Sequence, residues 1–179
     1  MEITKLTDPI PINDIEFRVE RILEYNNAVY GILIPYKTAR IDMLRLDLIC
    51  TPFGWQNEYK RDSKGVLQCG IGIHNESEWI WKWSNGKPSQ YESEKGEYSD
   101  AFKRAGFMWG IGRELYDFPR IRVSLNDKEF LFKDGKYKAS AYFRPSEWDW
   151  EINQDGTKIV AKDSQGKERF NSNPYKKSI

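Results

Sequence analysis

From Leu67 to His74 the chain reads LQCGIGIH, in which apolar residues alternate with small or polar ones. A period of two places alternate side chains on opposite faces of an extended strand. One face of this strand then carries only apolar side chains, which are Leu67, Cys69, Ile71 and Ile73. The pattern predicts a β-strand with one face in the core, so the chain must supply a layer that covers this face.

Two further runs with strand character flank this one, WQNEYKR at 55–61 and EWIWKW at 78–83. The connections DSKG and NES are typical of turns, so we predict an antiparallel β-meander. In the last run Trp79, Trp81 and Trp83 share one face. Three roles fit this stripe: packing in the core, a seam between subunits, or a stacking platform for bases or sugars.

Two β-rich runs in residues 17–36, FRVERILEYNNAVYGILIPY, surround the turn signal Tyr25-Asn26-Asn27 and predict an N-terminal hairpin. The lead-in TDPIPIND is expected to be irregular.

A helix is predicted from Lys37 to Cys50, ended by Thr51-Pro52 and Gly54. On a helical wheel it has two apolar stripes, Ile41/Leu44/Leu48 and Met43/Leu46/Cys50. Two stripes imply a layer on each side, from this chain or from a neighbouring subunit.

A second, longer helix is predicted from an N-cap at Ser99 to about Tyr116, before Pro119. Apolar side chains cover more than half of its circumference. Lys103 and Arg104 mark the two edges of its one narrow polar strip. They are either the solvated edge of a core helix or an anion site, since cations near a helix N-terminus add to its positive potential.

This helix also contains three glycines, at 106, 110 and 112, each costing about 1 kcal/mol relative to Ala. Such a cost is tolerated where another backbone packs closely, and Gly106 with Gly110 would form one groove.

The rest of the chain is β-rich. Strands are predicted at IRVSL, at EFLF and in the pair EWDWEI–TKIVAK around Gln154-Asp155-Gly156, followed by a loose tail. We therefore predict an α+β fold in which an antiparallel β-meander and the N-terminal hairpin pack on a long helix, with additional C-terminal strands. The chain is expected to form a single domain over 1–179, with its core at about 15–125, a β-rich extension at 126–165 and a loose tail at 166–179.

Catalytic signals are poor. The only histidine, His74, has no nucleophile motif beside it, no GKS or GKT phosphate loop occurs, and the acids are scattered. Cys50 and Cys69 lie in apolar runs and are expected to be buried thiols. We therefore expect no enzyme activity, no cofactor and no metal.

The chain shows no membrane or export signal: no apolar run approaches about 20 residues, and the start MEITKLTDPIPI does not resemble a signal peptide. We expect a cytoplasmic protein. Net charge is only +1, but residues 36–61 and 99–122 each carry five cations against three acids. This local basic excess is a weak signal for an anionic partner.

Three segments in order carry a family resemblance: residues 36–60, the runs VLQCGIGI and EWIWKW, and residues 99–119. Together they resemble the Rad52-like single-strand annealing superfamily, especially its phage and bacterial branch of Sak-type annealases and DdrA-like repair proteins. The motifs that match are Phe53-Gly54-Trp55, Ser99-Asp100, Lys103-Arg104-Ala105 and Gly110-Ile111-Gly112-Arg113. The resemblance covers about residues 15–125.

The resemblance implies a β-β-β-α annealase core that assembles into a ring or open spiral, with single-stranded DNA in an outer basic groove. By this comparison Lys103 and Arg104 hold the phosphate backbone and Arg40 joins them. Lys64 falls near a position used for a second, outer DNA contact. The family pattern has a further cation one turn later, where this chain has Phe107; the groove is then less cationic, or Arg113 compensates.

Local charge alone adds Lys37, Lys60 and Arg61 as further candidate DNA contacts. The implied function is ATP-independent annealing of complementary strands in homologous recombination and repair, in bacterial or phage-infected cytoplasm near the nucleoid. The implied partners are single-stranded DNA, other copies of the chain, and a single-strand-binding protein or recombinase. Two alternatives stay open: a repair protein that protects 3′ single-stranded ends without strong annealing, and a Trp-rich carbohydrate-binding module.

Overall fold

The computed structural model describes residues 2–87, 93–153 and 157–173. It is an α+β fold with antiparallel sheets and few helices, as predicted. The chain forms two compact units, one of residues Met1–Ile10 with Lys37–Arg113 and one of Pro11–Tyr36 with Glu114–Ile179. The single-domain organisation stays a prediction.

The first unit contains the predicted meander. Its elements are η1 (Ile3–Thr7), α1 (Ala39–Cys50), β3 (Trp55–Arg61), β4 (Leu67–Asn75), β5 (Glu78–Asn85) and α2 (Ser93–Met108). The strands pair antiparallel in the order β3-β4-β5. Gly70 in β4 lies between Glu58 and Trp83 on the neighbouring strands. The strand positions predicted from the period of two are therefore confirmed.

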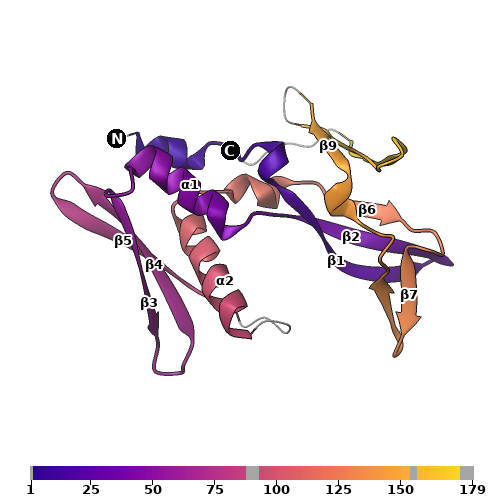
Figure 1. The fold of residues 1–179 in the computed structure, drawn as a ribbon, viewed down its shortest axis with the longest axis horizontal. Helices are drawn as coiled ribbons and strands as arrows, with labels where there is room; N and C mark the ends of the chain where they lie inside the picture. The colour runs from indigo at the N-terminus through magenta and orange to yellow at the C-terminus, as the bar shows by residue number, and fades with distance from the viewer. Residues whose placement is uncertain (1, 88–92, 154–156, 174–179) are drawn as a thin grey trace. The chain divides into compact units, whose positions relative to one another are not determined.

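α2 covers the apolar face of this sheet (Figure 1). The shared core is formed by the apolar side chains of β4 and of the helix, Leu67, Cys69, Ile71, Ile73, Ala101, Phe102, Ala105 and Trp109. The Trp109 indole Nε1 donates a hydrogen bond to the Ile71 carbonyl oxygen at 3.0 Å. Cys50 and Cys69 are buried free thiols, as predicted, and burial raises the pKa of Cys69 to about 12.

The limits of α2 differ from the prediction. The helix begins at Ser93, so Ser99 is an interior residue whose hydroxyl donates to the Gly96 carbonyl at 3.1 Å. It ends at Met108 rather than near Tyr116, because Gly110 and Gly112 adopt φ values of 98° and 78°. Glycine reaches this left-handed region without the steric cost that other residues have, and it commonly ends a helix. A 3₁₀ helix, η3 (Arg113–Asp117), follows.

Of the two predicted apolar stripes of α1, only the one with Leu46 and Cys50 faces this core, and its third member, Met43, is 40% exposed. Leu46 and Cys50 are buried, whereas the side chains of Leu44 and Leu48 are 58% and 82% exposed. After the helix, Phe53 is 93% exposed. The outer stripe is therefore not covered by any of the residues that the structure describes.

The second unit contains the predicted hairpin, β1 (Glu16–Tyr25) and β2 (Ala28–Tyr36). Asn26 and Asn27 both have positive φ, 50° and 58°, as a two-residue hairpin turn of the primed type requires. β2 also pairs with β6 (Ile121–Ser124). The predicted packing of this hairpin on the long helix stays a prediction, because the helix belongs to the first unit.

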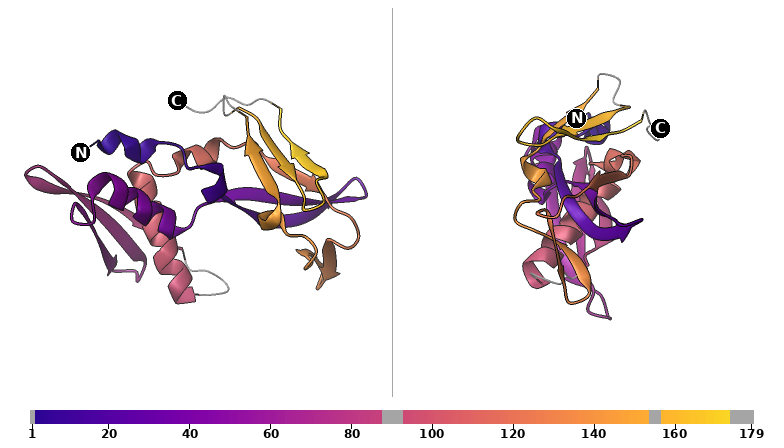
Figure 2. Two further views of the ribbon diagram at one scale, coloured as in Figure 1. Left: turned by 45° about the horizontal axis from the view of Figure 1, so that its top comes forward. Right: turned by 90° about the vertical axis from the view of Figure 1, so that its right-hand side faces the viewer.

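The remaining strands form a short hairpin and a small sheet. They are β7 (Phe130–Lys133), β8 (Lys136–Ala139), β9 (Asp149–Ile152), β10 (Ile159–Lys162) and β11 (Glu168–Asn171), with η2 (Ile12–Asp14) and η4 (Pro145–Glu147) as short 3₁₀ turns. Figure 2 shows β9, β10 and β11 side by side. The strands at 149–152 and 159–162 are confirmed, while their predicted turn at 154–156 lies outside the described residues.

The predicted loose tail from residue 166 is wrong over 168–171, where β11 pairs with β10. Arg169 in this strand is only 10% exposed and pairs with Glu129 and Asp163, which helps to hold the strand in this unit.

Gly106 in α2 permits a close approach between the two helices. A Cβ atom there would lie 2.5 Å from the Asp42 Oδ1 atom of α1. We predict that Gly106→Ala lowers the free energy of unfolding by about 1–3 kcal/mol, although alanine favours an isolated helix by about 1 kcal/mol. Urea denaturation measures this change. A variant more stable than the parent would contradict the prediction, because it would show that the two helices move apart at no cost.

Candidate nucleic-acid interface

A buried ion pair lies where α1 meets α2. Asp42 is 0% exposed and Lys37 is 6% exposed. The Lys37 ammonium donates to Asp42 Oδ1 and, at 2.7 Å, to the carbonyl oxygen of Ile111. One side chain thus connects the chain before α1, the helix α1 and the segment that follows α2.

Burial raises the pKa of Asp42 to about 6, against the opposing effect of nearby cations. Lys37 lowers it most among these cations, followed by Lys103 and Arg45. The second carboxylate oxygen, Oδ2, has no hydrogen-bond partner among the described residues. Asp42 is therefore a buried negative charge around which three cations gather.

Lys37, predicted to contact DNA, is placed inside the protein by this pair. Its ammonium satisfies Asp42 and the end of the α2 segment, and removing it from that site would leave a buried carboxylate uncompensated. Lys37 is therefore a structural residue, and we exclude it from the candidate interface.

Two of the predicted cations lie on the two helices near their crossing. Arg40 is exposed in the first turn of α1, two residues before Asp42, and makes no hydrogen bond or ion pair with the described residues. Lys103 is half-buried, three residues before Gly106, and is near enough to Asp42 to lower its pKa. Lys103 thus lies near the buried carboxylate, whereas Arg40, two positions from Asp42 on the same helix, points to another side of α1.

Arg104 lies beside Lys103 but forms an ion pair one turn back, with its Nε 2.7 Å from Asp100 Oδ2. The same oxygen accepts the backbone N–H of Lys87 at 3.0 Å. The Arg104 side chain is 41% exposed. Its guanidinium can therefore meet a phosphate while Asp100 fixes its position on the helix.

Arg113 lies beyond the end of α2 and binds its last carbonyl groups. Its Nε and Nη2 atoms donate to the carbonyl oxygens of Phe107 and Met108, each at 2.9 Å. Lys82 adds a third donor, 3.1 Å from the Met108 oxygen. Cations at a helix C-terminus are stabilising, so Arg113 has a capping role whether or not it also meets a ligand.

The three cations of the first meander hairpin have different surroundings. Arg61 donates to Glu97 of α2 at 3.0 Å and to the Gly65 carbonyl at 2.8 Å, which fastens the hairpin to the helix. Lys60 lies on the opposite face of the sheet, where its ammonium is 3.6 Å from the Trp83 ring centroid. Lys64 is exposed in the turn. These residues do not form one cluster.

Sequence reasoning missed two residues that shape the site. Asp42 is an acid in a basic segment, and nothing in its spacing shows that it would be buried. Arg45 donates to the backbone oxygens of Asp8 and Pro9, at 2.6 and 3.2 Å, and so holds the lead-in on α1. The presence of an acid among the cations of one helix was the only available signal.

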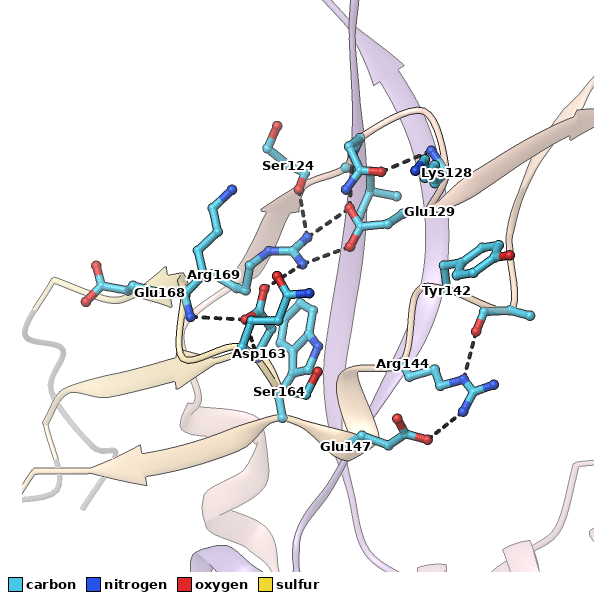
Figure 3. A pocket seen from close by; sticks show the side chains of 16 residues that line it. Ser124, Lys128, Glu129, Tyr142, Arg144, Glu147, Asp163, Ser164, Glu168 and Arg169 are labelled. Atoms are coloured by element: carbon cyan, nitrogen blue, oxygen red, sulfur yellow. Dashed lines mark hydrogen bonds and ion pairs between the residues drawn. The ribbon is translucent and has the colours of Figure 1, made fainter.

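The second unit has a hollow of about 810 Å³ (Figure 3). At its floor Arg169 pairs with both oxygens of Glu129, at 2.8 and 3.0 Å, and with Asp163 at 3.4 Å. Four cations and four carboxylates line the hollow, so its formal charge is zero. None of the predicted DNA-binding residues lies there, and two of its cations, Arg144 and Arg169, are paired with carboxylates.

Two structural features bear on other classes of function. Among the described residues, no group of three or more His, Cys, Asp or Glu side chains is placed to hold a metal ion. No helix within residues 2–87, 93–153 and 157–173 is long and apolar enough to cross a lipid bilayer.

The buried pair gives a pH-dependent prediction. Lys37→Met leaves the Asp42 carboxylate unpaired and should lower the free energy of unfolding by about 3–5 kcal/mol at pH 8. The pKa of Asp42 is already raised to about 6 and rises further without the cation. The folded state then takes up a proton as pH falls, so the deficit should shrink toward pH 5.

The control is Lys37→Met with Asp42→Leu, which removes both charges. Neither charge remains, so this site should contribute no pH dependence to its own free energy of unfolding, as followed by urea denaturation at each pH. A deficit in the single variant that is constant from pH 8 to pH 5 would contradict the burial of an ionised Asp42.

The comparisons with known proteins give one family. The model described as Rad52/22 family double-strand break repair protein matches residues 64–131, a little over a third of the chain. No curated protein and no solved structure matches the chain. The matched residues include Lys64, Lys103, Arg104 and Arg113, whereas Arg40, Lys60 and Arg61 lie before them. The resemblance to the Rad52-like superfamily is confirmed: from the last two strands of the meander through α2, this chain is similar to Rad52/22 family double-strand break repair proteins.

Proposed function

We propose that the protein binds single-stranded DNA through its phosphate backbone and promotes annealing of complementary strands in recombination and repair, without ATP and without catalysis. The observation that carries this proposal is the family match, which includes the adjacent cations Lys103 and Arg104 on α2. Arg40 on α1 supplies a third cation near the same helix crossing. These three residues form the proposed backbone contact, and Lys64 with Arg113 are secondary candidates.

The physical requirements of annealing fit such a site. Base pairing supplies the driving force, so the protein needs only to neutralise phosphate repulsion and to keep the bases unpaired until they meet. Lys and Arg that bind phosphate do this without sequence preference. A chain with a net charge of +1 can do so when its exposed cations converge and many copies line one strand.

The exposed stripe of α1 supports assembly of several copies. Leu44, Leu48 and Phe53 present apolar surface that the described part of the chain leaves uncovered. Contiguous exposed apolar surface of this kind commonly marks a protein–protein interface. We propose that this stripe lies against a neighbouring copy in a ring or spiral, and that a single-strand-binding protein or recombinase is a further partner of the assembly.

Removing both α2 cations should weaken DNA binding and leave the fold intact. We predict that Lys103→Ala with Arg104→Ala lowers affinity for single-stranded DNA by about tenfold or more. The slope of log K against log salt should decrease in magnitude by about 1.4, or about 0.7 for each phosphate that the protein no longer neutralises. Fluorescence anisotropy over a salt series measures both quantities.

The matched control is Lys133→Ala with Lys136→Ala, which removes the same charge from the exposed β7–β8 hairpin. It should bind DNA as the parent does. Equal weakening in both variants would mean that net charge alone governs affinity, and normal affinity in the folded α2 variant would exclude this site.

A paired assay separates annealing from end protection. Annealing predicts faster pairing of two complementary strands, whereas a protein that protects 3′ ends would shield one strand from a nuclease without accelerating pairing. We expect acceleration by the parent protein without ATP, and no acceleration by the α2 variant.

A further inference from the structure

The β3–β5 sheet has a second face, turned away from α2. The register places Lys60, Glu58, Gly70, Gly72 and the tryptophans of β5 on this outer face. Trp81 and Trp83 are half-buried here, so no described part of the chain fully covers them. The stripe of tryptophans is therefore not part of the core beneath α2.

The two inner rings of the stripe lie flat on the backbone of β4. A Cβ atom on Gly72 would lie 2.8 Å from the Trp81 ring, and one on Gly70 would lie 2.6 Å from the Trp83 ring. Any residue other than glycine would push these rings away from the strand. The two glycines, which weaken a strand interior, are thus explained by the position of the rings.

A ring that lies flat on a sheet turns its other face outward. Trp81 and Trp83 are nearly parallel, with an angle of 23° and centroids 5.8 Å apart. Trp79 differs, because it meets His74 edge-on at 65°. Trp81 and Trp83 are therefore nearly parallel neighbours, whereas Trp79 is turned toward His74.

We propose that Trp81 and Trp83 stack bases of the single-stranded DNA that the protein binds. This inference rests on the proposed function and adds a base-binding surface to it. Every base has a flat π-face, so stacking on aromatic side chains requires no particular sequence. Side chains two residues apart on a strand lie about 6.6–6.8 Å apart, which lets two neighbouring bases stack on separate rings.

The charges on this face favour bases over a purely ionic contact. The Lys60 ammonium lies over the Trp83 ring, 3.6 Å from its centroid. A base that stacks on this ring displaces the ammonium, which can then reach the phosphate next to that base. Glu58 occupies the same face, directly opposite Gly70 in the register. The negative charge of Glu58 repels phosphates but does not repel a neutral base. The DNA backbone is therefore expected to run along the edge of the sheet near Lys60.

The test compares two oligonucleotides of the same length, oligothymidylate and an abasic deoxyribose-phosphate chain. We expect the parent protein to bind oligothymidylate more tightly. Trp81→Leu with Trp83→Leu should lower that affinity by about 5- to 150-fold per stacked base and leave affinity for the abasic chain unchanged. Phe at both positions should retain most of the difference, because it keeps the aromatic face.

The matched control is Trp79→Leu, the same change on the same strand at a residue that does not lie on glycine. It should leave the preference for oligothymidylate intact. Tryptophan emission of the unmodified protein provides a measurement that does not depend on any variant folding: oligothymidylate should quench it and the abasic chain should not.

The possible outcomes separate the two proposals. If the parent binds both chains equally and is quenched by neither, the base platform is excluded while backbone binding stands. If it binds neither chain, the proposed function itself fails. Oligosaccharide binding that is absent from the Leu variant, without any change in DNA affinity, would assign the rings to a carbohydrate. Dissociation of oligomers in the Leu variant, with base preference intact, would assign them to a subunit seam.

Discussion

The buried pair between Lys37 and Asp42 fixes the geometry on which the proposed DNA contact depends. Two charges removed from water cost several kcal/mol each unless they meet with good geometry. Here the ammonium also binds the Ile111 carbonyl, and Gly106 lets the carboxylate lie directly against α2. The entry to α1, the two helices and the segment after α2 are therefore held together at one point. Lys103 lies near this point, and Arg40 lies on the helix α1 that the pair holds.

The meander uses its two faces for different purposes. The face toward α2 carries the apolar side chains of β4 and forms the core of the first unit. On the other face, glycines in β4 make room for two flat tryptophan rings. Lys60 and Arg61 illustrate the division, since these sequence neighbours lie on opposite faces, one against Trp83 and the other against Glu97. Adjacent cations in a strand cannot share one site.

Much of the fold was predictable from the sequence because its signals are local. The period of two in β4 and the Asn26-Asn27 turn each specify a structure within a few residues. The end of α2 is not predictable in the same way, because a glycine tolerated inside a helix and one that ends it with a positive φ, as Gly110 and Gly112 do, look alike in the sequence.

The candidate site was less predictable, since it depends on distant partners. Lys37 is separated from the Ile111 carbonyl by 74 positions, and no pattern around Lys37 indicates that they meet. The same holds for Arg169, which joins the second unit through Glu129, 40 residues earlier. Residue type and order indicate which cations could bind DNA. Only the folded chain shows which of them form ion pairs with carboxylates.

The difference between paired and accessible cations affects how the net charge of +1 should be interpreted. Lys37, Arg61 and Arg169 each face a carboxylate that is less than 10% exposed, so their charges are largely used inside the protein. A phosphate chain instead meets accessible cations, and its attraction to them depends on where they lie rather than on the sum. On the two helices, Arg40 is exposed, Arg104 is partly exposed, and Lys103 lies half-buried near Asp42. A nearly neutral chain can therefore still present a locally basic surface to DNA.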